Sequence, residues 1–241
     1  MNRSLPLETR TNGEMSLTDH LTELRRRLIR ILAAVSGGTL FCYWHIQTIM
    51  AALTAPAGSL YYMKPAEAFL LYIKAAVLCG TIAASPVIFY ELWAFLLPAF
   101  TRREKKFLLL LVPSSLALFL AGISFSYFFV LPQGLHFFLT FSDGAIQPLL
   151  SIESYLEFLF LLVLPFGCIF NVPLLLTALA MGGVLTSEML QKARRYVILG
   201  AFILAAVITP TPDVFTQVLL ALPILFLYEV SRLVIRYVLK K

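Results

Sequence analysis

The sequence is poor in charged residues and in cysteine, and both shortages limit what the protein can be. Only 13% of its 241 residues are Asp, Glu, Lys or Arg, whereas 60% are hydrophobic. The mean hydropathy of +0.87 is far too apolar for a domain that must present a wet surface. The three cysteines lie far apart inside apolar runs, which excludes a disulfide framework and a CxxC metal site. We therefore predict an integral membrane protein without a metal or cofactor.

Signatures of nucleotide binding and of catalysis are also missing. The chain has no GxxxxGK[ST], HExxH or GxSxG element, and its three histidines are scattered. The formal net charge of +6 could suggest nucleic acid, but the basic residues cluster at the ends of apolar runs, without the aromatic interleaving of a nucleic-acid surface. The expected contact of these clusters is a membrane surface, and the expected protein is not an enzyme.

Six apolar segments predict an all-α, polytopic membrane protein. The first four are long enough to cross a hydrocarbon core of about 30 Å. The fifth and sixth, with 13 and 17 residues, predict short helices that sit where the bilayer is thinned or tilted. Prolines inside the segments predict kinked helices in a cupped arrangement. The segments cover approximately residues 28–47, 68–97, 107–131, 154–179, 196–208 and 214–230.

The positions of the basic residues predict which side of the membrane each loop faces. Seventeen of the 19 Lys and Arg residues lie before or at the start of the first segment, between the second and third, between the fourth and fifth, or after the sixth. Six spans place all four groups on one side, and basic loops are retained in the cytoplasm. We therefore expect both termini in the cytoplasm, with Lys64 in an opposite-side loop and Lys74 inside a span.

The stretch "SLTDHLTELRRRL" (16–28) predicts an amphipathic helix on the cytoplasmic interface that runs into the first span. Ser16 and Asp19 fit a capping box, and Glu23 and Arg27 form an i, i+4 ion pair. An orientation anchor explains the arginines of this helix but does not require Glu23. The apolar stripe consists of Leu17, Leu21, Leu24 and Leu28.

A second acid stands among basic residues in "TRREKK" (101–106). Thr101 followed by Glu104 fits a capping box, which would place the acid near the positive end of the third span. A binding role for Glu104 is compatible with this cap, so both interpretations stay open.

Five stretches of the chain, in order, resemble the TatC family, the multi-span receptor subunits of the twin-arginine protein translocase. The resemblance covers a single domain of residues 16–241 and leaves residues 1–15 as a variable tail. The stretches are "HLTELRRRL" (20–28), "SPVIFYELWAFLLPAF" (85–100), "SYLEFLFLLVLPFGCIFNVP" (154–173), "KARRYVILGAFILAAVITPTPDVFTQ" (192–217) and "ALPILFLYEV" (221–230).

The resemblance implies a receptor in the bacterial cytoplasmic membrane that binds signal peptides with paired arginines. It would export folded proteins with TatA, TatB and other copies of itself, driven by the proton-motive force. The implied binding residues are Glu23 and Glu104, with Arg25 in the same patch. Two guanidiniums fit two carboxylates in bidentate geometry, and the surrounding basic residues would hold anionic lipids.

Polar residues inside the spans suggest an alternative, a small-solute secondary transporter with a midplane site built from Lys74, Glu91 and Asn171. Such folds show internal symmetry and matched broken helices, and the sequence shows neither. Structural interpretations are available for Lys74, which can snorkel to the outer interface, and for Glu91, at the cytoplasmic end of its span. The resemblance implies an acid or its amide in the fourth span, facing the cupped interior; Asn171 keeps the hydrogen-bonding capacity of such a residue but cannot carry a charge or a proton there.

The turn "ITPTPDVFTQ" (208–217) joins the two short segments. The resemblance implies that it is part of a docking surface for TatA and TatB, with Thr209, Asp213 and Gln217 as polar contacts. A simple N-cap by Asp213 in a packed turn is the alternative. Ser154 and Glu157 fit a further cap at the start of the fourth span.

Overall fold

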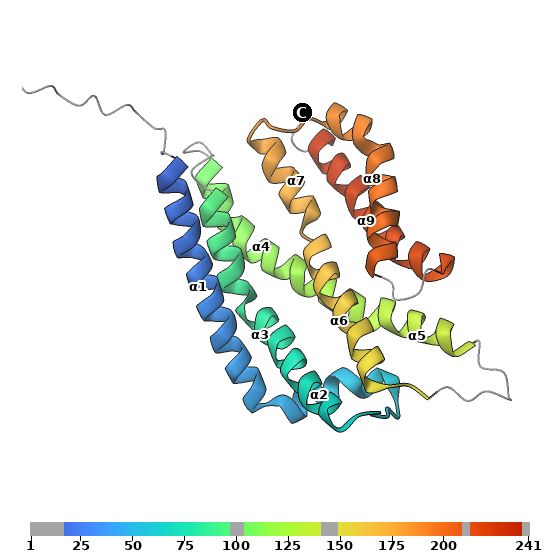
Figure 1. Ribbon diagram of the computed structural model, residues 1–241. Helices are drawn as coiled ribbons and strands as arrows, with labels where there is room; N and C mark the ends of the chain where they lie inside the picture. The colour runs from blue at the N-terminus through green and yellow to red at the C-terminus, as the bar shows by residue number, and fades with distance from the viewer. Residues whose placement is uncertain (1–16, 97–103, 141–148, 209–212, 238–241) are drawn as a thin grey trace, which may run out of the picture.

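The computed structural model describes residues 17–96, 104–140, 149–208 and 213–237, which form a bundle of helices, as predicted (Figure 1). Within these residues, the backbones of Tyr61 and Ser151 form an isolated parallel β-bridge. The elements are α1 (Leu17–Trp44), α2 (Ile46–Thr54), the 3-10 turn η1 (Ala55–Ala57), α3 (Pro65–Leu96), α4 (Glu104–Phe125), the π-helical turn η3 (Ser126–Val130), α5 (Leu131–Thr140), α6 (Ile152–Ile169), α7 (Val172–Met181), α8 (Ser187–Ile208) and α9 (Val214–Tyr237).

Four helical stretches are long and apolar enough to cross a membrane: 66–95, 110–140, 152–181 and 214–237. A fifth is formed if Leu21–Trp44 and Ile46–Ala57, which meet at 83°, are counted as one broken span. Helix α8 is not among them. The count of six spans and the side on which the termini lie therefore stay predictions.

The last two helices are longer than predicted. Helices α8 and α9 contain 22 and 24 residues, so the expectation of two short helices is wrong. The apolar part of α8 is short, as predicted from residues 196–208, but the helix begins earlier. It also includes the basic stretch 187–195, which contains no glycine or proline that would interrupt it. By length and hydropathy, α9 is able to cross a membrane.

Helix α1 joins the predicted amphipathic segment and the predicted first span without a break. Its 28 residues correspond to about 42 Å of helix. The segment therefore prolongs the axis of the span instead of turning away from it (Figure 1). The leucines of the predicted apolar stripe that the structure describes are exposed, at 63% for Leu21, 44% for Leu24 and 53% for Leu28.

The third and fourth predicted spans are interrupted helices. Helix α4 continues through η3 into α5, and α6 gives way to α7 at Phe170 and Asn171. Pro173 is in the first turn of α7 and has no N–H for the carbonyl of Ile169, which accounts for the interruption. Other prolines predicted within spans lie inside α3, α4, α6 and α9: Pro86, Pro113, Pro165 and Pro223.

Glycines bring pairs of helices into close contact, a common packing mode in membranes. A Cβ atom added at Gly80 of α3 would lie 2.4 Å from the backbone N of Thr39 of α1, and one at Gly38 would lie 2.6 Å from the carbonyl O of Gly80. Helices α4 and α6 are joined in the same way, because a Cβ at Gly122 would lie 2.5 Å from the carbonyl O of Phe166. These contacts allow α1 to lie along α3 (Figure 1).

Helix α6 lies at the centre of the largest core cluster. Its Leu156, Leu159, Leu162 and Phe166 are fully buried, and they pack with side chains of α3, η3, α5, α8 and α9. Many other large apolar side chains are exposed, as expected of surfaces that face lipid. Helix α6 is therefore the element around which this core cluster is built.

A buried carboxylate joins the start of α3 to the start of α6. Glu67 is only 6% exposed. Its Oε2 accepts hydrogen bonds from the backbone N–H groups of Met63 (2.8 Å) and Lys64 (3.0 Å). Its Oε1 accepts from Ser151 Oγ and from the backbone N–H of Glu153, both at 3.3 Å.

The same junction corrects the predicted start of the fourth span. Helix α6 begins at Ile152, and the side chain of Ser151 accepts a hydrogen bond from the N–H of Glu153 as its N-cap. The predicted cap from Ser154 and Glu157 is therefore wrong, because both residues already lie within the helix.

Candidate functional site

Four charged side chains form a cluster between α1 and α3, which we call the α1–α3 ion cluster: Glu23, Arg27, Arg30 and Glu91. Arg27 Nε and Nη2 both donate to Glu23 Oε1, the first at 3.1 Å, which confirms the predicted i, i+4 pair. Arg27 Nη1 donates to Glu91 Oε2 at 2.8 Å. Arg30 Nη1 donates to Glu91 Oε1 at 3.1 Å.

Burial differs strongly among the members of this cluster. The side chain of Glu91 is 5% exposed, that of Arg27 16% and that of Glu23 26%, whereas Arg30 is 55% exposed. A carboxylate as buried as Glu91 is costly unless it is paired and hydrogen-bonded, and the two arginines provide this pairing. Glu91 is therefore an internal counterion that fastens α3 to α1.

The second predicted signal-peptide acid, Glu104, is the first residue of α4. Its side chain and Thr101 lie outside the described residues, so the predicted capping box stays a prediction. Helices α1 and α4 begin at the same end of the bundle (Figure 1). Arg25, on α1, is exposed. The two implied acids thus belong to helix starts at one end of the molecule.

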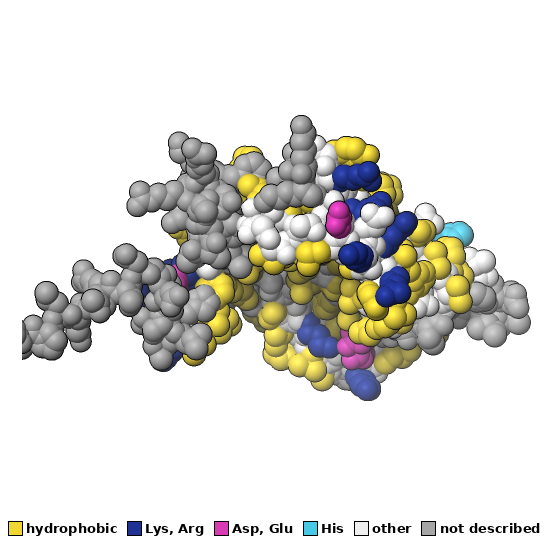
Figure 2. All heavy atoms as spheres, turned by 90° about the horizontal axis from the view of Figure 1, so that it is seen from above, with side chains coloured by type: hydrophobic (Ala, Val, Ile, Leu, Met, Phe, Trp, Pro, Cys, Tyr) yellow, Lys and Arg dark blue, Asp and Glu magenta, His cyan; other side chains and the backbone are white. Residues whose placement is uncertain are grey.

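A second ionic group lies at this end, between α8 and α9. Glu229 accepts from Arg194 Nε and from Arg232 Nη2, each at 2.8 Å. The hydroxyl of Tyr228 donates to the carbonyl O of Leu190 at 2.6 Å and adds a further link between the two helices. Viewed from this end, several Lys and Arg side chains gather on one part of the surface (Figure 2). Sequence reasoning did not single out Glu229.

The three polar residues of the alternative midplane site do not come together. Lys74 Nζ donates to Glu157 Oε1 of α6 at 3.0 Å, and both side chains are about half exposed. Glu91 belongs to the α1–α3 ion cluster, and 17 residues separate it from Lys74 on the same helix, about 25 Å. Asn171 Nδ2 donates to the carbonyl O of Gly167 at 3.0 Å, within the α6–α7 interruption. Each of the three residues therefore has a different partner, and they do not form a common site.

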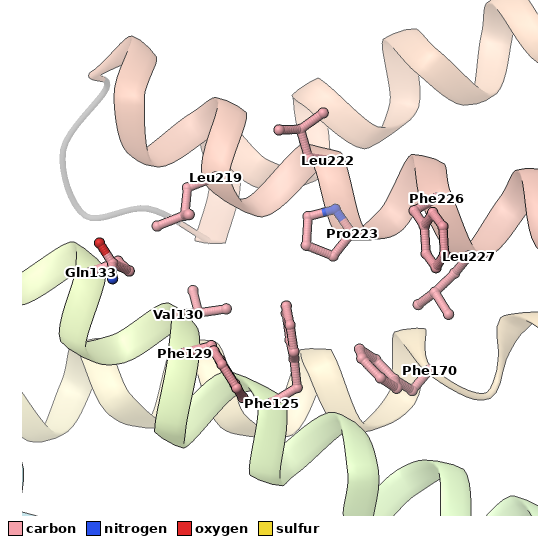
Figure 3. A pocket seen from close by; sticks show the side chains of 10 residues that line it. All are labelled: Phe125, Phe129, Val130, Gln133, Phe170, Leu219, Leu222, Pro223, Phe226 and Leu227. Carbon is pink, nitrogen blue, oxygen red and sulfur yellow. The ribbon is translucent and has the colours of Figure 1, made fainter.

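An apolar pocket of about 700 Å³ lies between the η3 region and α9 (Figure 3). Phe170 lines it, whereas the neighbouring Asn171, which we expected to face the interior, is not among its lining residues. Gln133 is the polar side chain of the lining. The other lining residues are Phe125, Phe129, Val130, Leu219, Leu222, Pro223, Phe226 and Leu227.

The predicted partner-docking turn is described from Asp213 onward, and Thr209 lies outside the described residues. Asp213 Oδ2 accepts from the N–H of Thr216 at 2.7 Å, and the Thr216 hydroxyl donates to Asp213 Oδ1. Asp213 thus caps α9, as the structural alternative predicted. Gln217 Nε2 donates to the carbonyl O of Phe202 at 3.0 Å and links α9 to α8. Among the described residues, no three His, Cys, Asp or Glu side chains are grouped to hold a metal ion.

Comparison with known proteins identifies the family. The family model described as Sec-independent protein translocase protein (TatC) matches residues 19–223. The chain belongs to the TatC family. A crystal structure described as the twin-arginine translocase receptor TatC superposes with a TM-score of 0.81 at 39% identity, covering 89% of this chain and 96% of that one.

Curated TatC sequences resemble the chain over most of its length. The TatC protein of Desulforapulum autotrophicum is 42% identical over 230 residues, covering 92% of this chain and 85% of that protein. The chloroplastic TatC of Pisum sativum is 40% identical over 219 residues, covering 89% of this chain and 62% of that longer protein. The predicted family is therefore confirmed, and the chain is a TatC-type subunit of a twin-arginine protein translocase.

Proposed function

We propose that this TatC-family subunit binds twin-arginine signal peptides through Glu23 and Glu104, with Arg25 in the same patch. The observation that supports the proposal is the ion pair of Glu23, whose carboxylate binds the guanidinium of Arg27. A carboxylate at this position is therefore accessible to a fork-shaped cation in suitable geometry. Helix α4, which begins with Glu104, starts at the same end of the bundle and offers the second acid.

The proposed setting is the bacterial cytoplasmic membrane, with this end of the bundle and both termini in the cytoplasm. The basic residues of α8 and α9 and of the 101–106 stretch would contact anionic lipids. TatA and TatB would dock near the α8–α9 turn, where Thr209, Asp213 and Gln217 offer polar groups. Further copies of the chain would complete the translocase, and the proton-motive force would drive export of folded cargo.

Glutamine substitutions at the two acids test the binding role. Crosslinking of a twin-arginine signal peptide to membrane vesicles is expected to fall roughly tenfold or more in Glu104→Gln and in Glu23→Gln, since a charge-assisted bond is lost in each. Glutamine can still close a capping box, so α4 should form normally in Glu104→Gln. Membrane insertion is measured in the same vesicles and is expected to be unchanged.

The matched control is Glu188→Gln, which removes an exposed acid from the first turn of α8. It changes the net charge by the same amount as the test variants and should leave crosslinking unchanged. Normal crosslinking in both test variants, or an equal loss in the control, would contradict the proposal.

A further inference from the structure

Arg27 is shared between two carboxylates on different helices. It directs Nε and Nη2 toward Glu23 and Nη1 toward Glu91, so that one guanidinium bridges both acids. The other partner of Glu91 is Arg30, whose side chain is 55% exposed, so that water can replace Glu91 as its hydrogen-bond partner. The four side chains carry two positive and two negative charges.

This arrangement places a resident guanidinium on a carboxylate that the proposed function assigns to a guanidinium of the signal peptide. An arriving arginine has to displace Arg27 from Glu23 or share Glu23 with it. Arg27 is only 16% exposed, so displacement would be unfavourable if it left this charge without a partner. Glu91, which is 5% exposed and already bonded to Arg27, supplies that partner on α3.

We propose that Arg27 is a built-in competitor of the signal-peptide arginine, and that Glu91 is the positioning residue that retains Arg27 when Glu23 is taken over. The inference rests on the proposed binding role of Glu23 and deepens it. Glu91 does not touch the peptide. Glu91 controls how strongly Arg27 binds Glu23. It thereby sets the affinity for the signal peptide and the discrimination against ligands whose cations bind Glu23 more weakly.

Binding of a fluorescent twin-arginine signal peptide to the purified full-length protein in lipid nanodiscs tests this role. In Glu91→Gln, the neutral amide holds Arg27 less well and Arg27 shifts onto Glu23, so the Kd should rise roughly fivefold to tenfold. In Arg27→Gln, the competitor is absent, and the Kd should fall below that of the unmodified protein.

Two double variants with equal net charge separate competition from simple electrostatics. Arg27→Gln/Glu91→Gln lacks the competitor, so its Kd should return to within about twofold of the unmodified protein. Arg30→Gln/Glu91→Gln keeps Arg27 on Glu23 and should stay as weak as Glu91→Gln alone. Equal Kd values for the two double variants would overturn the proposal, because net charge would then explain the effect.

If Glu91→Gln does not yield a monodisperse protein, the single variants decide: Arg27→Gln should tighten binding and Arg30→Gln should not, and any other order overturns the proposal. Glu23→Gln distinguishes the binding role of Glu23 from the competition by Arg27. An unchanged Kd in Glu23→Gln refutes the binding role of Glu23 together with the competition, whereas weaker binding there with no response to Glu91→Gln refutes the competition alone.

Discussion

Replacing Gly80 by alanine is expected to prevent α1 and α3 from packing and to eliminate most of the folded protein. The new methyl group would lie 2.4 Å from the backbone N and 2.6 Å from the Cα of Thr39. These are backbone atoms of a neighbouring helix, which cannot rotate away as a flexible side-chain end can. Overpacking typically costs about 1–3 kcal/mol and occasionally more, and a contact this short with a backbone places Gly80→Ala at the upper end of that range. The measurement is the yield of monodisperse protein after solubilisation, together with its temperature of thermal aggregation.

The matched control is Gly37→Ala on α1, one residue from the contact. A Cβ atom at Gly37 would have no heavy atom within 4 Å beyond its own residue, its chain neighbours and the adjacent turns of its own helix backbone. Alanine is the better helix former, so this variant should be as stable as the unmodified protein or more stable by up to about 1 kcal/mol. If the two alanine variants behave alike, the described approach of α1 to α3 is incorrect.

Removing the carboxylate of Glu67 is expected to cause the second large loss of stability. In Glu67→Ala, two backbone N–H groups near the start of α3 and the Ser151 hydroxyl lose their acceptor. The N–H of Glu153 loses one of its two acceptors and keeps Ser151 Oγ. Each buried donor left unpaired costs about 1–3 kcal/mol, although water can reach some of them. We expect a decrease of at least about 3 kcal/mol in the free energy of unfolding, measured as a lower thermal midpoint in detergent.

The control for this variant is Glu153→Ala, which removes a nearby acid but leaves its backbone N–H in place. Only a favourable charge in the first turn of α6 is lost, a change of about 0.5 kcal/mol. Equal thermal midpoints for the two variants would show that the hydrogen bonds to Glu67 do not stabilise the junction.

Features that depend on neighbouring residues were predictable from the sequence. The apolar segments predicted an all-helical membrane protein, and the spacing of Glu23 and Arg27 predicted an ion pair that the structure contains. The ends of helices were less predictable. The basic stretch 187–195 has no strong breaker, so α8 continues through it, although hydropathy places the start of the span later. At α6, two serines compete for the cap and Ser151 takes it.

Contacts between distant helices could not be predicted in the same way. Arg27 and Glu91 are 64 residues apart, and Lys74 and Glu157 are 83 apart. Their pairing depends on how α1, α3 and α6 are rotated and shifted against one another, and hydrophobic periodicity does not encode this register. Glu91 was therefore interpreted as an interfacial acid, although it is the most buried member of the α1–α3 ion cluster. The i, i+3 spacing of Arg27 and Arg30 on one helix face was the available signal.

The junction at Glu67 also has a consequence for the order in which the chain is assembled during synthesis. The local donors of this carboxylate, Met63 and Lys64, precede it, whereas Ser151 and Glu153 follow it by 84 and 86 residues. Helices α1 and α3 are close in the chain and can pair as soon as both have left the ribosome, because local contacts form early. The carboxylate remains half satisfied until α6 arrives. Closing of this junction therefore requires both halves of the chain, and the carboxylate gains its full set of donors only after α6 has been synthesised.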